Sequence, residues 1–509
     1  MSETADSAGT DTADGHTDGN VLFVVLDTVR KDHLTPYGYD RPTTPALEAF
    51  ADEARVYENA VAQAPWTLPS HASMFTGLYP SDHAATQEDP YLADDIGTLA
   101  QALRASGHAT ACYSSNAWIT PYTRLTAGFD RQDNFFEVMP GDLLSGTLAD
   151  IWQRINDNER LRAVADRLVE LGNSVHEHLA GGEGADTKTP EVIDRTIEFT
   201  DETDDWFAFI NLMDAHLPVY PPGEYREEFA PGVDPNAVCQ NSKEYNSGAR
   251  DVSESEFDDI RGLYDAEIRH IDAQLERLFD HLKRTGQWED TTVVVCADHG
   301  ELHGEHDLYG HEFCIYDPLV NVPLMVKAPG LEPGREEQTV ELLDLYHTTL
   351  DAAGATDTAG TAGHGGEAFD PTRSLLRDEA RQFEGGEYGF VEYHRPVVEL
   401  NQLETKAAEA GIELDRDSRF YSRMRAARRA DAKYIRNERI PDEGYRLDED
   451  PGEMEPVGTD DPAVAEVEAT LREFEEWVGG EWDTVDDGDV LGDMSDDARA
   501  RLQDLGYME

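Results

Sequence analysis

Two apolar stretches of this chain lead into acidic or imidazole side chains, and this pattern constrains the fold more than any other feature. Residues 21–26 (VLFVVL) are followed at once by Asp27, and residues 292–296 (TVVVC) stand just before Asp298 and His299. Unbroken apolar runs of this length are typical of strands that are buried on both faces of a parallel sheet. Because parallel strands end at one edge of their sheet, we expect these polar side chains to lie close together.

Segments with helical spacing separate the strand-like runs over most of the chain. Three further runs have the composition of buried strands, at 109–113, 206–212 and 322–326. Apolar residues recur at helical spacing in 46–55, 96–106, 257–284 and 342–353. This alternation predicts an α/β fold with a doubly wound, mostly parallel sheet between helices.

A change of composition after residue 372 predicts a second, smaller unit. Residues 354–372 have the composition of a Gly/Thr/Asp linker, and short strand-like pieces follow between Arg-rich and acidic stretches. We therefore expect a main α/β domain over 20–372 and a C-terminal α+β subdomain with a small antiparallel sheet and a helix over 373–509. Residues 1–19 predict a disordered acidic leader, and the amphipathic stretch 140–185 predicts a surface helix pair or a lid.

The chain is strongly acidic. Its 509 residues include 106 Asp and Glu against 41 Lys and Arg, which gives a formal net charge of -65. Charge of this sign repels nucleic acid and anionic lipid, so we expect neither as a partner. Only seven of the basic residues are lysine, and an acidic, lysine-poor surface is typical of proteins that work in high salt. The composition predicts a halophilic protein that is destabilised in dilute buffer.

The four cysteines, Cys112, Cys239, Cys296 and Cys314, form no paired motif, and two of them lie in apolar runs. Buried, unpaired thiols are typical of proteins in reducing compartments. The first residues contain no basic segment followed by an apolar one, and no window is apolar enough to cross a membrane. We therefore expect a cytoplasmic protein without a membrane span.

The predicted sheet edge carries a candidate metal site. Asp27, Asp298 and His299 would offer two carboxylates and an imidazole to one ion, and Gly300 would allow the backbone to approach closely. The alternative is that Asp27 caps the next turn and that residues 298–301 form an ordinary polar turn.

Thr67 is the candidate nucleophile. It stands in the run 64–77 (APWTLPSHASMFTG), in which Pro69 restricts the residue before it to extended geometry and small, helix-compatible residues follow. A threonine hydroxyl is a weak nucleophile unless a metal or a base lowers its pKa, and the predicted metal site would do so. The alternative is a threonine that only caps a helix.

Three histidines and one lysine are candidate contacts for an anionic group. His71 stands one helical turn beyond the threonine, His216 follows the strand-like run 206–212, and His311 lies in a segment rich in Gly and His. Lys327 ends an apolar run in a chain with few lysines, and a half-buried ammonium there needs an anionic partner. Each of these residues could instead have a purely structural role.

Taken in order, these motifs resemble those of the sulfatase family within the alkaline-phosphatase superfamily. They are VLDTVRKDHL at 25–34, WTLPSH at 66–71, DHGE at 298–301, VPLMVK at 322–327 and YRLDEDP at 445–451. The resemblance covers roughly residues 20–455. It implies an alkaline-phosphatase-like α/β sandwich with a small C-terminal subdomain, one or two divalent cations and a covalent intermediate on the nucleophile. Asp27, Asp298 and His299 match metal ligands of the family, and Thr67 matches the nucleophile, which also contacts the metal.

The resemblance also implies roles for the other candidates. His71 matches a position where the family signature usually has Arg, and His216 and Lys327 match groups that hold the oxygens of the ester. His311 is similar to a histidine near the leaving group in threonine-dependent relatives. The sequence has no Gly-Lys-Trp-His motif, and Asn116 lies at the nearest predicted strand end, which makes it a candidate substrate-binding residue.

Thr67 departs from the family pattern in a way that changes the expected chemistry. Sulfatases of the family carry Cys or Ser there, which is oxidised to formylglycine, and the methyl group on the threonine β-carbon prevents that aldehyde. No formylglycine is therefore expected, and phosphate monoesters or diesters are favoured over sulfate esters. Thr28 replaces the usual second acidic ligand, so the donor set favours Mn or Zn over Ca or Mg.

The sequence leaves several functions open. The favoured one is a hydrolase of small-molecule or glycan sulfate or phosphate esters that forms a covalent Thr67 intermediate. The alternatives are a sulfuric ester hydrolase without formylglycine, a transferase of phospho groups to a sugar or lipid headgroup, and a non-catalytic member that binds anionic glycans. Loops 80–95, 118–150 and 218–250 are expected to form the pocket for the alcohol part, and the sequence does not indicate the oligomeric state.

Overall fold

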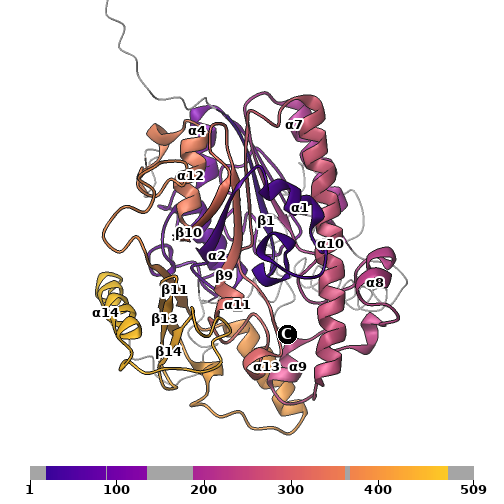
Figure 1. Cartoon of the computed structure of the whole chain (residues 1–509), viewed down its shortest axis with the longest axis vertical. Coiled ribbons are helices and arrows are strands. Elements are labelled where there is room, and N and C mark those ends of the chain that lie inside the picture. The colour runs from indigo at the N-terminus through magenta and orange to yellow at the C-terminus, as the bar shows by residue number, and fades with distance from the viewer. Residues whose placement is uncertain (1–18, 88, 135–186, 361–366, 480–509) are drawn as a thin grey trace, which may run out of the picture.

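The computed structural model describes residues 19–87, 89–134, 187–360 and 367–479 (Figure 1). Almost all of the expected acidic leader and the whole of the amphipathic stretch 140–185 lie outside these residues. Among the described residues, no helix is both long and apolar enough to cross a bilayer. The four cysteines are buried and free, as expected for the two in apolar runs.

An eight-stranded sheet forms the centre of the molecule, and its strand order is β10-β2-β9-β6-β1-β5-β3-β4. In chain order the strands are β1 (Asn20–Leu26), β2 (Arg55–Val61), β3 (Ala109–Ser114), β4 (Arg131–Asn134), β5 (Trp206–Leu212), β6 (Thr291–Cys296), β9 (Asn321–Lys327) and β10 (Gly334–Glu341). Every residue of β5 and β6 is buried, which explains why their sequences are continuously apolar rather than alternating.

Strand β1 lies between β5 and β6 and is parallel to both. Leu26 is paired with Leu212, and Val25 is paired with Cys296, so the three strands end almost level. The residues that follow them, Asp27 among them, therefore share one sheet edge. Strand β9 is the exception, because it runs antiparallel to both of its neighbours, β2 and β6.

Helices cover both faces of this sheet (Figure 1). One group contains α1 (Pro45–Ala51), α7 (Thr189–Glu202) and the 32-residue α10 (Glu254–Thr285), and the other contains α2 (Thr67–Thr76), α4 (Leu99–Ser106) and α12 (Asp344–Ala352). Shorter elements lie in the connections, namely α3 (Pro80–His83), α8 (Gly223–Phe229), α9 (Ser242–Asn246), α11 (Asp317–Val320) and the hairpin of β7 (Leu302–His303) and β8 (Tyr309–Gly310). This arrangement confirms the predicted α/β class with a mostly parallel central sheet.

A second, antiparallel sheet is built by the C-terminal part of the chain. Its order is β11-β12-β13-β14. The strands are β11 (Gly389–Tyr393), β12 (Met424–Arg428), β13 (Ala432–Asn437) and β14 (Glu443–Arg446), and helices α13 (Val397–Glu409) and α14 (Pro462–Trp477) accompany them. Figure 1 shows α14 covering one side of this small sheet, in yellow. The expectation of a small C-terminal sheet with a helix is confirmed.

Several elements differ from the sequence-based expectations. The helix expected over 46–55 ends at Ala51, and β2 begins at Arg55. Strands β2, β10 and β12 were not predicted, because charged residues interrupt their apolar patterns. Residues 218–250, expected to be a long surface loop, contain α8 and α9.

Candidate active site

Asp27, Asp298 and His299 form a buried cluster at the carboxyl edge of β1 and β6. Each of the three side chains offers one ligand atom, and these atoms lie within 4.8 Å of one another. All three side chains are fully buried, and neither Asp27 Oδ1 nor Asp298 Oδ2 has a hydrogen-bond partner among the described residues. The predicted metal ligands are thus brought together.

The electrostatics of this cluster favour a bound cation. Burial and the neighbouring Asp27 carboxylate raise the pKa of Asp298 well above its usual value. Burial opposes ionisation of Asp27 too, but His216 and His299 outweigh it and lower the pKa of that carboxyl. Two buried carboxylates with one unpartnered oxygen each are costly unless a positive charge lies between them. Their two oxygens and one imidazole nitrogen form a donor set that suits a divalent metal.

Thr67 lies beside this cluster, as the sequence predicted. It is the first residue of α2, and its Oγ1 lies 3.5 Å from His299 Nε2. The residue is 3% exposed, so little water reaches its hydroxyl. A helix N-terminus carries partial positive charge, which stabilises an oxygen that becomes negatively charged. The position therefore suits a nucleophilic hydroxyl.

Two asparagines fix the orientation of Asp27. Asn116 Nδ2 donates to Asp27 Oδ2 over 2.8 Å and to Thr67 Oγ1 over 3.2 Å. Asn211 Nδ2 donates to the same Asp27 oxygen over 2.9 Å. Both amides thus use one carboxylate oxygen and leave the other for a ligand. Asn116 was predicted from its strand end, whereas Asn211 was missed, although an amide inside the apolar run WFAFINL was a signal.

His71 lies on the same helix one turn after Thr67, but in the interior. Its Nδ1 is 2.9 Å from the Thr67 carbonyl oxygen and 3.4 Å from Asp298 Oδ2. Burial lowers the pKa of His71 to about 4, so the ring is neutral at ordinary pH. The structure places His71 behind the nucleophile and against a predicted metal ligand.

His216 and His311 lie next to each other on the open side of the cluster. Their ring centroids are 5.2 Å apart, and the His311 ring lies 4.6 Å from that of His299. His311 Nδ1 lies 3.1 Å from Glu301 Oε1. Burial disfavours the charged ring, but the Glu301 carboxylate outweighs it and raises the pKa of His311 to about 9. His311 is therefore held protonated, and Glu301 is a functional candidate that the sequence analysis did not single out.

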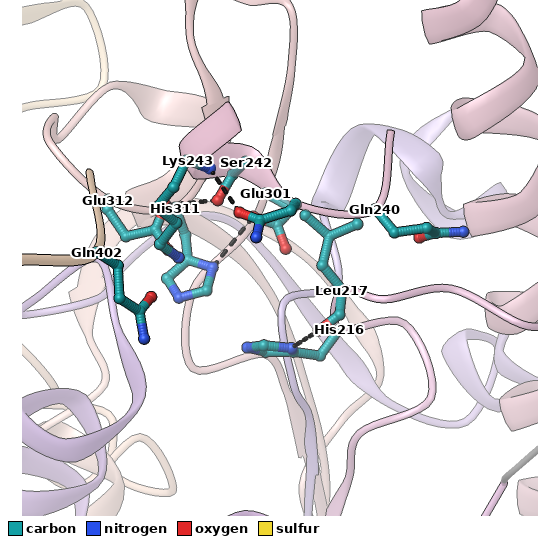
Figure 2. A pocket seen from close by; sticks show the side chains of 10 residues that line it. His216, Leu217, Gln240, Ser242, Lys243, Glu301, His311, Glu312 and Gln402 are labelled. Carbon is teal, nitrogen blue, oxygen red and sulfur yellow. Dashed lines mark hydrogen bonds and ion pairs between the residues drawn. The ribbon is translucent and has the colours of Figure 1, made fainter. Parts of the chain in front are cut away.

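A cavity of about 170 Å³ adjoins these two histidines (Figure 2). It is lined by His216, Leu217, Gln240, Asn241, Ser242, Lys243, Glu301, His311, Glu312 and Gln402. Lys243 forms an ion pair with Glu312, which lies 5% exposed in the wall. Residues 240–243 belong to the loop 218–250 from which a pocket was expected, and Gln402 comes from α13 of the C-terminal part.

Lys327 is not at this site, and its predicted contact with substrate is wrong. It ends β9 and is paired with Val293, near the amino end of β6, whereas Asp298 follows the carboxyl end. Its Nζ donates to the carbonyl oxygens of Trp288 and Thr291 and lies 4.9 Å from the centre of the Trp288 ring. The sequence-based placement failed because β9 runs antiparallel, which puts its last residue at the opposite edge of the sheet.

Gly300 is required because the segment after β6 approaches the backbone of α11 closely. A Cβ atom on this residue would lie 1.9 Å from the Pro318 carbonyl oxygen, and the Gly300 N–H donates to the Leu319 oxygen over 2.8 Å. We expect Gly300→Ala to displace His299 and to lower the unfolding free energy by about 2 kcal/mol or more, as overpacking in a core does. Chemical denaturation measures this loss. Gly223→Ala is the control, because this glycine, like Gly300, does not have a positive φ and nothing lies within 4 Å of its Cβ position; an equal loss there would contradict the steric explanation.

Comparisons with known proteins agree with this geometry. The family model described as Sulfatase matches residues 19–355. The choline-sulfatase of Rhizobium meliloti (strain 1021) is 24% identical over 493 residues, which span 91% of this chain and 87% of that protein. The multifunctional alkaline phosphatase superfamily protein PehA of Trinickia caryophylli is 28% identical over 385 residues, 66% of this chain and 74% of that protein.

The fold has counterparts among solved structures. The phosphonate monoester hydrolase of Agrobacterium radiobacter is similar with a TM-score of 0.62 at 21% identity, and the match covers 90% of this chain and 95% of that one. Since the family model matches well over half of the residues, this chain belongs to the sulfatase family.

Proposed function

We propose that this protein is a metal-dependent hydrolase of anionic phosphate or sulfate esters that works through a covalent ester of Thr67. The observation that carries the proposal is the position of the Thr67 hydroxyl. It lies at the N-terminus of α2, 3.5 Å from His299, beside two buried carboxylates that have unpartnered oxygens. Family membership supports ester hydrolysis as the reaction class.

Asp27, Asp298 and His299 would hold the divalent metal. When bound, the metal lowers the pKa of a nearby hydroxyl and neutralises charge on the ester oxygens. Asn116 orients the nucleophile, because its amide donates both to Thr67 Oγ1 and to Asp27. Thr67 releases its hydroxyl proton to solvent, and its Oγ1 forms a bond to phosphorus or sulfur while the bond from that atom to the alcohol oxygen breaks.

His311 is the candidate general acid for the departing alcohol. Glu301 holds its ring in place and keeps it protonated, so a proton is available on the open side of the cluster. His216, beside it, is placed to bind an oxygen of the ester. Water then attacks the Thr67 ester and regenerates the hydroxyl.

Phosphate esters are favoured over sulfate esters because threonine cannot form the formylglycine aldehyde. The relatives divide on this point, since one is a choline-sulfatase and one solved structure is a phosphonate monoester hydrolase. A sulfuric ester hydrolase that uses threonine directly is therefore the second candidate, and it would use the same site.

One assay separates these candidates. The protein is loaded with Mn²⁺ or Zn²⁺ in molar KCl, the condition that its charge of -65 favours, and nitrophenol release is followed from the phosphate monoester, the phosphate diester and the sulfate ester. Turnover of the phosphate esters is the expected result. Turnover of the sulfate ester alone would reverse the preference inferred from Thr67, and turnover of none would contradict hydrolysis. Product that forms only with an added alcohol would indicate a transferase.

The wall of the cavity supports a small, hydroxyl-rich alcohol as the leaving group. Among the described residues that line it, Leu217 is the single aliphatic side chain and there is no Phe, Tyr or Trp, and the charge of Glu312 is already balanced by Lys243. Quaternary ammonium groups are recognised by aromatic faces and aryl groups by apolar walls. Amides and a balanced ion pair instead offer donors and acceptors to hydroxyl groups.

The double variant Lys243→Met/Glu312→Gln tests this wall. Removing both charges together leaves no unpaired buried ion, so we expect the protein to fold. The ratio of kcat/KM for a sugar ester to that for the nitrophenyl ester should fall by about tenfold, the loss of one to two hydrogen bonds. Parallel steady-state assays give this ratio. The exposed pair Arg131 and Glu202 provides the matched control, as Arg131→Met/Glu202→Gln. An unchanged ratio in the cavity variant would exclude this wall from substrate recognition.

A further inference from the structure

Thr28, the residue after Asp27, has a backbone conformation that its side chain disfavours. Its φ is 60°, and the residue is fully buried. A positive φ is rare outside glycine and is a true outlier for a β-branched residue. Such conformations cost free energy and persist only where the surroundings enforce them, often at functional sites.

Thr28, in its left-handed conformation, links by hydrogen bonds the two loops that carry the proposed metal ligands. The Thr28 N–H donates to Asp298 Oδ1 over 3.4 Å, which joins the loop after β1 to the loop after β6. The Thr28 hydroxyl donates to the Asp27 carbonyl oxygen over 2.6 Å. As a result, one oxygen of Asp298 is occupied by backbone N–H groups, and the other is one of the two unpartnered oxygens of the cluster.

Tyr264 of α10 holds this turn from the side. Its hydroxyl donates to the Thr28 carbonyl oxygen over 2.7 Å and accepts from the Arg30 N–H over 2.8 Å. The side chain is fully buried, and its ring packs edge-on against His33 and His303 at 5.1 and 4.7 Å. The hydroxyl of this residue on the 32-residue helix α10 therefore fixes the carbonyl group of Thr28 and the N–H two residues later, on the C-terminal side of the strained residue.

We propose that Tyr264 is a positioning residue for the metal site. Its hydroxyl holds Thr28 in the left-handed conformation, and this conformation aims the carboxylates of Asp27 and Asp298 at one ion. The inference rests on the proposed metal dependence, but it concerns a residue that does not touch the ion. Partners that orient metal ligands typically change metal affinity by about 10- to 100-fold when they are removed.

The test is the affinity of the full-length protein for Mn²⁺ and Zn²⁺. Protein stripped with EDTA is titrated with each metal by calorimetry in molar KCl, as wild type and as Tyr264→Phe. The variant keeps the ring and removes only the hydroxyl, and we expect it to bind metal at least about tenfold more weakly. Circular dichroism of the metal-free variant checks that it folds.

The chain offers a closely matched control. The Tyr37 hydroxyl also donates to a backbone carbonyl oxygen and accepts from a backbone N–H, both of Leu324, at 3.0 and 2.9 Å. Tyr37→Phe removes the same two kinds of hydrogen bond away from Asp27, and we expect its metal affinity to stay within about threefold of wild type. Equal losses in the two variants would show a general loss of stability and would overturn the proposal.

A second substitution tests the strain itself. Glycine adopts a positive φ without penalty, so Thr28→Gly should keep the turn even when the Tyr264 hydroxyl is absent. We expect Thr28→Gly/Tyr264→Phe to recover most of the affinity that Tyr264→Phe loses, and this non-additivity is the signature of coupling. An unchanged affinity in Tyr264→Phe, or a double variant that recovers nothing, would overturn the role of Tyr264. Absence of metal binding to the wild type would instead remove the proposed function.

Discussion

Thr67→Ala is expected to abolish turnover of every ester that the protein hydrolyses. Without the hydroxyl no covalent ester can form, and loss of a nucleophile typically lowers kcat by about 10⁴-fold or more. The side chain is small and stands at the start of α2, so we expect folding to be retained. The three proposed metal ligands remain, so Mn²⁺ or Zn²⁺ should still raise the melting temperature. Steady-state assays and thermal scans on one preparation give both quantities.

Two further variants make the Thr67 result specific. Thr67→Ser keeps a hydroxyl and should retain measurable turnover. Thr76→Ala removes a buried hydroxyl from the other end of the same helix, where it donates to the Ala72 carbonyl oxygen, and should retain nearly full turnover. If Thr67→Ala kept more than a tenth of the wild-type rate, another group would have to be the nucleophile.

Asp298→Asn is expected to change stability in opposite directions with and without metal. In the metal-free protein the two buried carboxylates face each other, and the neighbouring Asp27 and burial raise the pKa of Asp298. A neutral amide removes the repulsion between the two buried acidic side chains. It can still accept hydrogen bonds from the Thr28 and His299 N–H groups through Oδ1. The unfolding free energy without metal should therefore rise, because the amide carries no charge that burial opposes.

With metal present the same substitution should be strongly unfavourable. Ligand at 100 times its dissociation constant stabilises a wild-type site by about 2.7 kcal/mol, and we expect most of this gain to disappear in Asp298→Asn. Turnover should fall by about 10³-fold, since the activation of Thr67 depends on the metal. The measurement is thermal unfolding at a series of Mn²⁺ concentrations.

The control for Asp298 is a buried acid with a structural role. Asp272 accepts hydrogen bonds from the Ala46 and Leu47 N–H groups at the start of α1. Asp272→Asn should leave the metal-induced gain in stability intact. A metal-dependent gain in Asp298→Asn equal to that of wild type would rule out Asp298 as a ligand.

The sequence by itself determined the centre of this site. Asp27 and the pair Asp298 and His299 follow unbroken apolar runs, and burial on both faces of a parallel sheet requires such runs to end at one edge. The two runs became β1 and β6, which are direct neighbours, so their ligands meet. Thr67 was predicted from the run 64–77 and its match to the family's nucleophile, and Asn116 from its place at a predicted strand end.

Only the tertiary structure decided which other residues reach the site. A strand-like pattern does not encode the direction of its strand, and the antiparallel course of β9 takes Lys327 to the far edge. Lys243 and Gln402 are 159 positions apart and meet in one cavity wall because α9 and α13 pack together, a contact to which no local pattern points. The strained Thr28 is held by Tyr264, 236 positions away, because hydrogen bonds from a distant helix can enforce a backbone conformation that the local sequence disfavours.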